Sequence, residues 1–442
     1  MRMKSSTDVA DDFIDHLAAN SGPGYIFPDL MAEVVKPRDN WPPQLKSLNF
    51  SDPDLIQTFA DSAGPTIRWL ESFGIRFGML PIWHLTGHTE RFAPSGGGLA
   101  LIEALAKHAE DHHVQFAYQT CAHTLIQNGK GAVVGLRTLE ADARSREYKA
   151  KAVVLACGGF EGNFEMLARY LGPQAIYLRP LAKGGYYNKG EGIRMALDIG
   201  AAPSGDYSNF HASPADPRSG KPDAANYIFP YGILVNRFGK RFIDEAPGPV
   251  DRTYENITRE IFRQPRNMAY VILDAKLRDV PGYTRAIRTD QKPEEASTIE
   301  DLATRLGLPR EVLAQTVREY NTACGRGRFA PLEMDGLSTL GLSPPKSNFA
   351  RSLDTPPFQA YPVICSNTFT FGGVKVDTKA RVININGDPI PGLYAAGEVI
   401  GLYYGDYTGA TSVLRGAVFG RIAGHSAAQR NSEFNAWPAP GP

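Results

Sequence analysis

A short apolar run near the C-terminus ends in two residues that suggest chemistry. The pattern of IPGLYAAGEV is typical of a buried strand, and it leads directly to Gly397 and Glu398. A glycine at a strand end lets the backbone approach a ligand closely, and Glu398 places a carboxylate at the same point. A tight turn with a surface glutamate explains the same spacing equally well.

A second candidate is the loop rich in glycine and tyrosine from Gly405 to Gly409. It leads into a helix near Thr411, so we expect the free N–H groups of the first helical turn to face a binding site. A helix N-terminus favours an electron-rich oxygen or a developing negative charge. A purely structural glycine loop is the competing interpretation.

Possible proton donors lie on both sides of one charged segment. Arg241 and Glu245 belong to LVNRFGKRFIDE, and His211, Arg252 and Tyr254 flank it. Each flanking residue could donate a proton. Surface salt bridges and solvated loop side chains explain the same residues, and spacing does not decide between the two interpretations.

Composition and missing motifs exclude several classes of function. The 442 residues include 47 Lys and Arg and 47 Asp and Glu, so the net charge is zero and no long-range field attracts nucleic acid. The four cysteines form no CxxC pair, so we expect no metal site. We find neither a secretory signal nor an apolar run of about 18 residues, and we therefore expect a cytoplasmic protein without a membrane segment.

The order of the expected elements predicts an α/β protein. Strands and amphipathic helices occupy both ends of the chain, and the middle has the pattern of a small α+β insert. We expect one domain to be split between residues 1–204 and 353–442, with a second domain at 205–352 inserted in it. A ligand is expected where the two domains meet.

Several segments together resemble one enzyme family. AVVLACGGFEGN, NKGEGIRMALDIGA, LVNRFGKRFIDE, FTFGGVKVD, PGLYAAGEV and FGRIAG have the order and separations of the flavoprotein subunits of the fumarate reductase and succinate dehydrogenase family. The resemblance covers nearly the whole chain. It implies a split, Rossmann-like FAD-binding domain with an inserted, mobile α+β capping domain, and a substrate held between cap and flavin.

The same resemblance implies the reaction and its participants. The family reduces or forms a carbon–carbon double bond next to a carbonyl or carboxylate, through hydride transfer at flavin N5. The implied cofactor is FAD, and the implied substrate is a small carboxylate or ketone. A separate electron-transfer partner is also possible.

The resemblance carries the cofactor contacts over by position. The implied residues are Gly158, Gly159, Gly397, Glu398, Ser412 and Val413. The first two match strand-end glycines near the nucleotide part of FAD, and the glutamate matches one that contacts the ribityl chain. The last two amides match a helix N-terminus at flavin N1 and O2, where a reduced flavin carries negative charge.

For catalysis and substrate binding the chain departs from the family. The implied catalytic residues are Arg252, Tyr254 and Tyr407, and the implied substrate contacts are His211, Thr368 and Glu245. His211 matches a carboxylate-binding histidine. Pro249 replaces the family's arginine proton donor, which leaves Arg252 and Tyr254 as candidates.

Two further replacements bear on the substrate. Thr368 stands where the family has a second histidine, and Tyr407 where it has a substrate-binding arginine. Fumarate and succinate are therefore poor candidates. The pattern is closer to the tricarballylate dehydrogenase branch, and a tyrosine in this loop is also similar to 3-ketosteroid dehydrogenases, in which a phenol polarises a ketone.

The largest departure from the family is at the start of the chain. Members open with a strand, GxGxxG and a helix that hold the ADP half of FAD. Met1 enters after that point, and the Gly96–Gly98 cluster follows polar loop residues. We expect a start codon further upstream or a fragment of a longer protein. The alternative is a non-catalytic descendant that binds a ligand or partner without redox chemistry.

Overall fold

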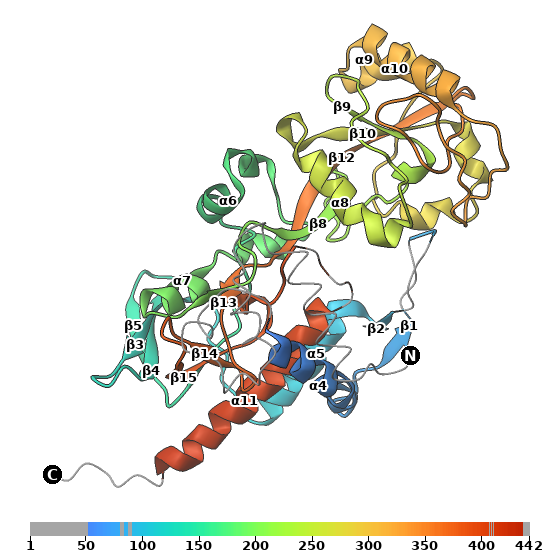
Figure 1. Ribbon diagram of the computed structural model, residues 1–442. Helices are drawn as coiled ribbons and strands as arrows, with labels where there is room; N and C mark the ends of the chain where they lie inside the picture. The colour runs from blue at the N-terminus through green and yellow to red at the C-terminus, as the bar shows by residue number, and fades with distance from the viewer. Residues whose placement is uncertain are drawn as a thin grey trace, which may run out of the picture.

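The protein is described by a computed structural model, in which residues 52–79, 84–86, 91–405, 407, 409 and 411–435 are placed. Figure 1 shows two bodies joined by β12, which is drawn in orange. The lower body contains the elements from both ends of the described chain, and the upper body contains those from the middle. This mixed helix and sheet architecture confirms the predicted α/β class.

The lower body is organised around a small parallel pairing. Strand β6 (Val153–Leu155) pairs in parallel with β15 (Pro389–Ala395), and β14 (Arg381–Ile383) pairs antiparallel with β15. Because parallel strands end at the same edge of a sheet, the residues that follow β6 and β15 come together. The long helix α11 (Ser412–Asn435) packs against β6, β15 and α4 (Pro53–Glu71).

The remaining elements of the lower body surround this pairing. They are β1 (Phe77–Met79), β2 (Phe92–Pro94), α5 (Gly97–Asp111), β3 (Thr120–Gln127), β4 (Val133–Glu140), β5 (Ser145–Lys149), α6 (Phe164–Leu171), α7 (Glu191–Asp198), β7 (Pro203–Ser204) and β13 (Gly373–Val374). The strands β3, β4 and β5 form an antiparallel meander.

The upper body is built on an antiparallel sheet. Its strands are β8 (Phe210–Ala215), β9 (Ile233–Asn236), β10 (Ala269–Leu273), β11 (Glu294–Ala296) and β12 (Phe358–Thr370). Its helices are α8 (Val250–Phe262), α9 (Ile299–Leu306) and α10 (Arg310–Ala323). Each helix buries its apolar face and exposes its polar face, as a helix on the surface of a sheet does.

Two elements carry side chains to the junction of the bodies. Strand β12 pairs with β10 through its first half and with β8 through its second half, so Phe369 and Thr370 lie at the lower end. Helix α8 begins after Pro249 and packs against both β8 and β12. It buries Tyr254 and Glu255 together with Ile257 and Ile261.

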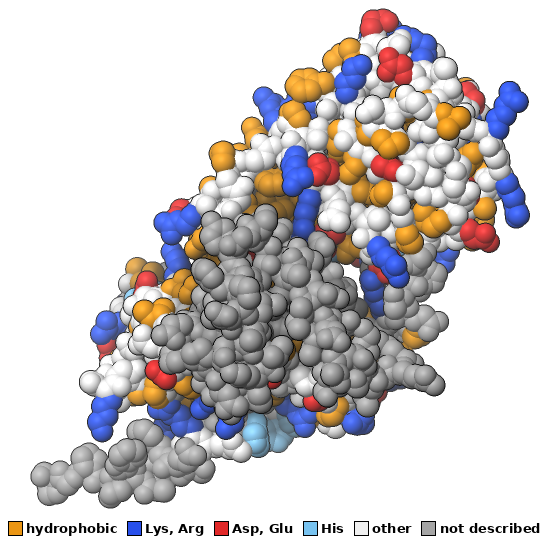
Figure 2. Space-filling view, viewed as in Figure 1, with side chains coloured by type: hydrophobic (Ala, Val, Ile, Leu, Met, Phe, Trp, Pro, Cys, Tyr) orange, Lys and Arg blue, Asp and Glu red, His pale blue; other side chains and the backbone are white. Residues whose placement is uncertain are grey.

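The buried apolar residues follow the same division. One cluster draws on residues 55–212 and 365–423, and two others draw mainly on residues 225–363. The boundaries at 205 and 353 stay a prediction. No helix in the described part of the chain is long and apolar enough to cross a membrane. Figure 2 shows basic and acidic side chains scattered among apolar ones on the described surface of this face.

Candidate active site

The strand ends of the lower body bring three predicted cofactor residues together. A methyl group added to Gly159 would lie 2.2 Å from Oε1 of Glu398 and 2.1 Å from Oγ1 of Thr370. Gly158 has a φ of 77° and packs against the side chain of Asn188. Glycine is therefore required at both positions, by close approach at Gly159 and by backbone conformation at Gly158.

Glu398 shares its surroundings with a second carboxyl group. Its Oε1 accepts hydrogen bonds from the N–H of Thr370 at 2.7 Å and from the Thr370 hydroxyl at 3.1 Å. Nearby, Nδ2 of Asn188 donates to Oε1 of Glu161 at 2.5 Å. Burial and the charge of Glu398 raise the pKa of Glu161 to about 9.

One proton is therefore held by this pair at neutral pH. Burial also raises the pKa of Glu398, but the Thr370 N–H and the charge of Arg415 oppose that rise. We place the proton on Glu161 and the negative charge on Glu398, because Glu398 receives the donors and faces the cation.

Arg415 is the least satisfied charged residue in this region. Its side chain is 2% exposed, and its Nε and Nη1 have no hydrogen-bond partner among the described residues. The guanidinium carbon lies 4.7 Å from the ring centre of Tyr403 and 5.5 Å from that of Phe369. A buried guanidinium with free donors is expected to meet an acceptor supplied by a ligand.

The N-terminus of α11 is occupied by a tyrosine hydroxyl. Oη of Tyr407 accepts from the N–H of Thr411 at 3.0 Å and from that of Ser412 at 3.1 Å. It also donates to Oγ of Ser412 at 3.1 Å. We expected the Ser412 amide to contact the flavin, but in this structure it donates a hydrogen bond to Tyr407. The side chain of Val413 is exposed.

Three predicted substrate and catalytic residues form one cluster above these groups. Oη of Tyr254 lies 3.5 Å from Nε2 of His211. The ring centre of Tyr407 lies 4.5 Å from that of His211, and Phe369 lies 5.3 Å from it. Nδ1 of His211 lies 3.4 Å from Oε2 of Glu255 and makes no hydrogen bond among the described residues. We call His211, Tyr254, Tyr407 and Phe369 the aromatic cluster.

A segment from the lower body supports Tyr254 from the other side. The ring of His84 stacks on Tyr254 with centres 5.3 Å apart. Nδ1 of His84 lies 3.0 Å from Oδ1 of Asp251, and Nη2 of Arg91 lies 2.5 Å from the same oxygen. No local pattern predicts the roles of His84 and Arg91, because nothing in the neighbouring sequence indicates that they reach α8.

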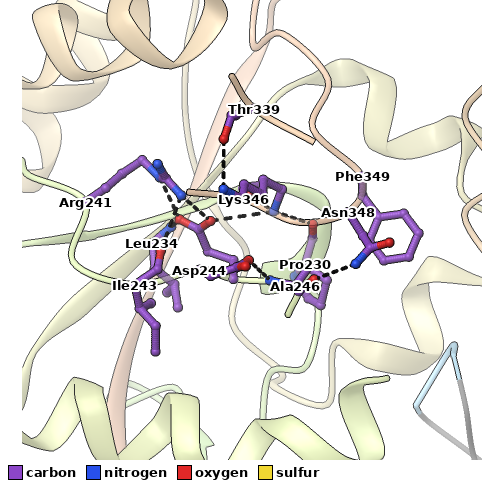
Figure 3. A network of polar contacts seen from close by, with 12 residues as sticks. Pro230, Leu234, Arg241, Ile243, Asp244, Ala246, Thr339, Lys346, Asn348 and Phe349 are labelled. Atoms are coloured by element: carbon purple, nitrogen blue, oxygen red, sulfur yellow. Dashed lines mark hydrogen bonds and ion pairs between the residues drawn. The ribbon is translucent and has the colours of Figure 1, made fainter. Parts of the chain in front are cut away.

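Glu245 lies away from this cluster, inside the upper body. Its carboxylate is fully buried and accepts from Nε of Arg241 at 2.9 Å, from Nη2 of Arg241 at 2.7 Å and from the Leu234 N–H at 2.9 Å. Figure 3 shows these bonds and the nearby ammonium group of Lys346, 3.7 Å from Oε2. Both oxygens are occupied, so Glu245 has no role in the site that we propose.

Two other expected residues make no recorded contact with the aromatic cluster. The side chain of Arg252 is exposed on α8, because the residues of this helix that face inwards are Val250, Tyr254 and Ile257. The hydroxyl of Thr368 pairs with that of Ser213 at 3.0 Å. We therefore carry Tyr254 forward as the proton donor and leave Arg252 out.

The residues present fit FAD. The glycine pair and the carboxylate of Glu398 lie on adjacent elements, and Arg415 adds two buried donors without partners among the described residues. Neutral and anionic oxygens of a cofactor are the natural acceptors for such donors. Arg415 and Glu161 were missed by the sequence reasoning, since an arginine in an amphipathic helix and a glutamate after a glycine pair are both ordinary surface patterns.

Comparison with known proteins is consistent with this fit. The family model described as "FAD binding domain" matches residues 21–414. The chain therefore belongs to the FAD-binding domain family, in the group of fumarate reductase-type flavoproteins. This assignment confirms the predicted cofactor, FAD.

Two curated relatives define the level of similarity. The chain is 30% identical over 391 residues to the NADH:acrylate oxidoreductase of Vibrio harveyi, covering 85% of this chain and 37% of that protein. It is 28% identical over 389 residues to a probable fumarate reductase of Shewanella frigidimarina, covering 86% of this chain and 62% of the relative. The chain thus spans less than two thirds of the length of these relatives.

Solved structures show the same fold. A flavocytochrome c3 fumarate reductase in its open conformation superposes with a TM-score of 0.69 at 27% identity, covering 86% of this chain and 64% of that one. A 3-ketosteroid-Δ4-(5α)-dehydrogenase from Rhodococcus jostii superposes with a TM-score of 0.62 at 24% identity, covering 95% and 83%.

Proposed function

We propose that the protein is an FAD-dependent oxidoreductase that reduces or forms a carbon–carbon double bond next to a carbonyl group. The observation that supports this most is the aromatic cluster, which brings a tyrosine, a histidine and the Tyr407 loop together beside residues that fit FAD. Bound FAD supplies hydride transfer at its N5. The relatives named for fumarate and acrylate support the same reaction class.

Tyr254 is the proton donor of this proposal. Burial, the hydroxyl of Tyr227 and the charge of Glu255 raise the pKa of Tyr254 far above its ordinary value, and the charge of Arg91 opposes this only in part. Tyr254 therefore keeps its proton at neutral pH and is a donor rather than a resting base. Its contact with His211 provides the route by which the proton is replaced.

His211 and Tyr407 bind and orient the substrate in this proposal. Nε2 of His211 lies 3.5 Å from Oη of Tyr254, and its Nδ1 lies 3.4 Å from Oε2 of Glu255 without a hydrogen bond among the described residues. An imidazole with a nitrogen that makes no hydrogen bond can donate to a carbonyl or carboxylate oxygen of a substrate. Tyr407 and Phe369 give the surroundings an apolar, aromatic character that suits the alkene part of a substrate.

The substrate class follows from what the aromatic cluster contains. Tyr407 lies beside His211 and stands where the fumarate reductases have a substrate-binding arginine, so we propose an unsaturated carboxylate or a ketone other than fumarate or succinate. A tricarballylate-like substrate is our first choice. A ketone bound in the manner of the 3-ketosteroid dehydrogenases is the second, and the tyrosines of the cluster favour it. A separate electron-transfer partner and a cytoplasmic location remain parts of this proposal.

The test compares the protein with a Tyr254→Phe variant. Both are loaded with FAD, reduced under anaerobic conditions and mixed with a panel of unsaturated acids and enones. We expect the native flavin to be reoxidised by at least one compound, and the variant to react about 10²–10⁴-fold more slowly, as expected for loss of a general acid. Tyr283→Phe, which changes a half-buried tyrosine outside the cluster, is the control.

The alternative functions give different results in the same experiment. A non-catalytic binding protein would fold but take up no FAD, or hold FAD that none of the compounds oxidises. Equal rates for the native protein and Tyr254→Phe would remove Tyr254 from the mechanism and leave the family assignment intact.

A further inference from the structure

One arginine of α8 contacts three separate parts of the molecule. Nη2 of Arg259 lies 2.7 Å from Oε1 of Glu255, 3.1 Å from the carbonyl oxygen of Phe210 and 3.0 Å from the carbonyl oxygen of Gly405. Glu255 belongs to the same helix, Phe210 to β8, and Gly405 to the loop that precedes Tyr407. Arg259 therefore joins the upper body to a loop of the lower body.

Each of the three acceptors is next to a residue of the aromatic cluster. The other oxygen of Glu255, Oε2, lies 3.4 Å from Nδ1 of His211 and places a carboxylate beside that ring. Phe210 directly precedes His211, and Gly405 lies two residues before Tyr407. A displacement of the Arg259 side chain would thus act on both His211 and Tyr407.

We propose that Arg259 is a positioning residue, which holds His211 and the Tyr407 loop in one arrangement. The orientation of these two site residues therefore depends on contact between the two bodies. This inference rests on the proposed function for its effect on turnover. It does not rest on that function for its effect on the structure, because the three contacts involve only residues of this chain.

A simple helix-surface ion pair does not explain the arrangement. An i,i+4 pair accounts for the contact with Glu255 alone, and it leaves the two carbonyl groups on other elements without a reason. The side chain of Arg259 is 17% exposed, so the contacts are shielded from solvent. All three acceptors contact the same nitrogen, Nη2, whose position is fixed by the planar guanidinium, whereas a lysine ammonium on a flexible stem has no such fixed position.

The first experiment measures structure without substrate. Amide hydrogen exchange is followed at Thr411 and Ser412, whose N–H groups bond Tyr407. We expect Arg259→Lys to increase their exchange rates about tenfold or more, because the Tyr407 loop loses its contact at Gly405. Arg263→Lys, one turn further along α8 with an exposed side chain, should leave the rates unchanged.

The second experiment measures turnover with the substrate found by the flavin test. We expect Arg259→Lys to lower kcat about tenfold or more with a smaller change in KM, at unchanged FAD content. Glu255→Gln keeps an acceptor for Arg259 but removes the charge next to His211. We expect this variant to lower kcat similarly while the exchange rates of Thr411 and Ser412 stay native.

The outcomes separate this inference from the proposed function. Native exchange rates in Arg259→Lys would overturn the positioning role, whatever the enzyme does. If Arg259→Lys does not fold, a native kcat in Glu255→Gln would overturn the part that acts through His211. If no substrate is found, the proposed function fails and the exchange measurement still decides the role of Arg259 in positioning Tyr407.

Discussion

Two buried carboxylates in this molecule have opposite surroundings. Glu245, in the upper body, accepts from Arg241 and Leu234 with both oxygens, and Lys346 stands beside it with further bonds to the carbonyl groups of Pro230 and Gly232. Glu398 lies beside Glu161, whose pKa is raised by burial and by the charge of Glu398, and it faces Arg415, whose Nε and Nη1 have no hydrogen-bond partner among the described residues. The first network is complete within the chain, and the second leaves two buried donors of Arg415 without a partner among the described residues.

The comparison explains why similar residue types have different roles. Buried charges are tolerated when they are paired and fully hydrogen-bonded, and such networks contribute to the specificity of a fold. Groups left unsatisfied in a buried site cost stability until a ligand satisfies them. We therefore propose that Glu245 stabilises the upper body and that Glu398 and Arg415 bind the cofactor.

The largest effect is expected from Glu245→Gln. This change leaves Arg241 and Lys346 buried without their counter-charge, which costs about 3–5 kcal/mol when one partner of a buried pair is removed. Urea unfolding measures the loss, and Glu260→Gln, which changes an exposed pair with Arg263, is the control. FAD affinity per folded molecule should stay native, and a loss of affinity without a loss of stability would reverse the assignment.

Arg415→Met should have the opposite profile. Methionine fills the space between Tyr403 and Phe369 without a buried charge, so the free energy of unfolding should be unchanged or higher. The dissociation constant of FAD, measured by equilibrium dialysis, should rise about tenfold or more, since a hydrogen bond from a charged donor contributes roughly 1.5–3 kcal/mol. Arg421→Met alters an exposed arginine of the same helix and should leave the constant unchanged.

The shared proton makes a prediction about pH. The pKa of Glu161 is 4.5 ordinarily and about 9 in the folded protein, so the folded chain binds more protons between these values. Stability is complete below the lower value and falls as pH rises through this window. Glu161→Gln mimics the protonated acid and should remove that fall, so its melting temperature should exceed the native one increasingly from pH 5 to about pH 9.

Identical pH dependence in the native protein and Glu161→Gln would show that the pair does not share a proton. Glu165→Gln, which changes an exposed carboxylate on α6, provides the matched control.

Tyr407→Phe is expected to cause a small loss of stability. It removes the acceptor of the Thr411 and Ser412 amides, which should lower the free energy of unfolding by about 0.5–1.5 kcal/mol. Tyr187→Phe, at a mostly exposed tyrosine, should change nothing. If the phenol also acts on the substrate, turnover falls by an order of magnitude or more; a native rate would limit Tyr407 to packing and helix capping.

Much of the site could be predicted because it depends on local patterns. Gly158, Gly159 and Glu398 follow apolar strands, and parallel pairing of β6 with β15 brings such strand ends together. His211, Tyr254 and Tyr407 were proposed from the resemblance, and the structure places them in one cluster.

Other parts of the site depend on information that is not local. The residue at which α8 begins, Val250, decides which side chains of the helix face inwards. Because the sequence alone does not fix that residue, it does not show whether Arg252 or Tyr254 faces the site. Glu245 pairs with Lys346, about a hundred positions further along the chain. The segment LVNRFGKRFIDE alone therefore does not show that both carboxylate oxygens of Glu245 have partners. His84, Arg259 and Arg415 act through contacts between elements that only the folded chain brings together.

The most direct test of the account is the anaerobic reoxidation of the reduced, FAD-loaded protein by an unsaturated acid or enone, followed by the visible absorbance of the flavin. We predict that at least one such compound restores the oxidised spectrum and is itself reduced at its double bond, and that Tyr254→Phe reacts far more slowly. Protein that takes up no FAD, or a reduced flavin that no compound of this class oxidises, would contradict the account.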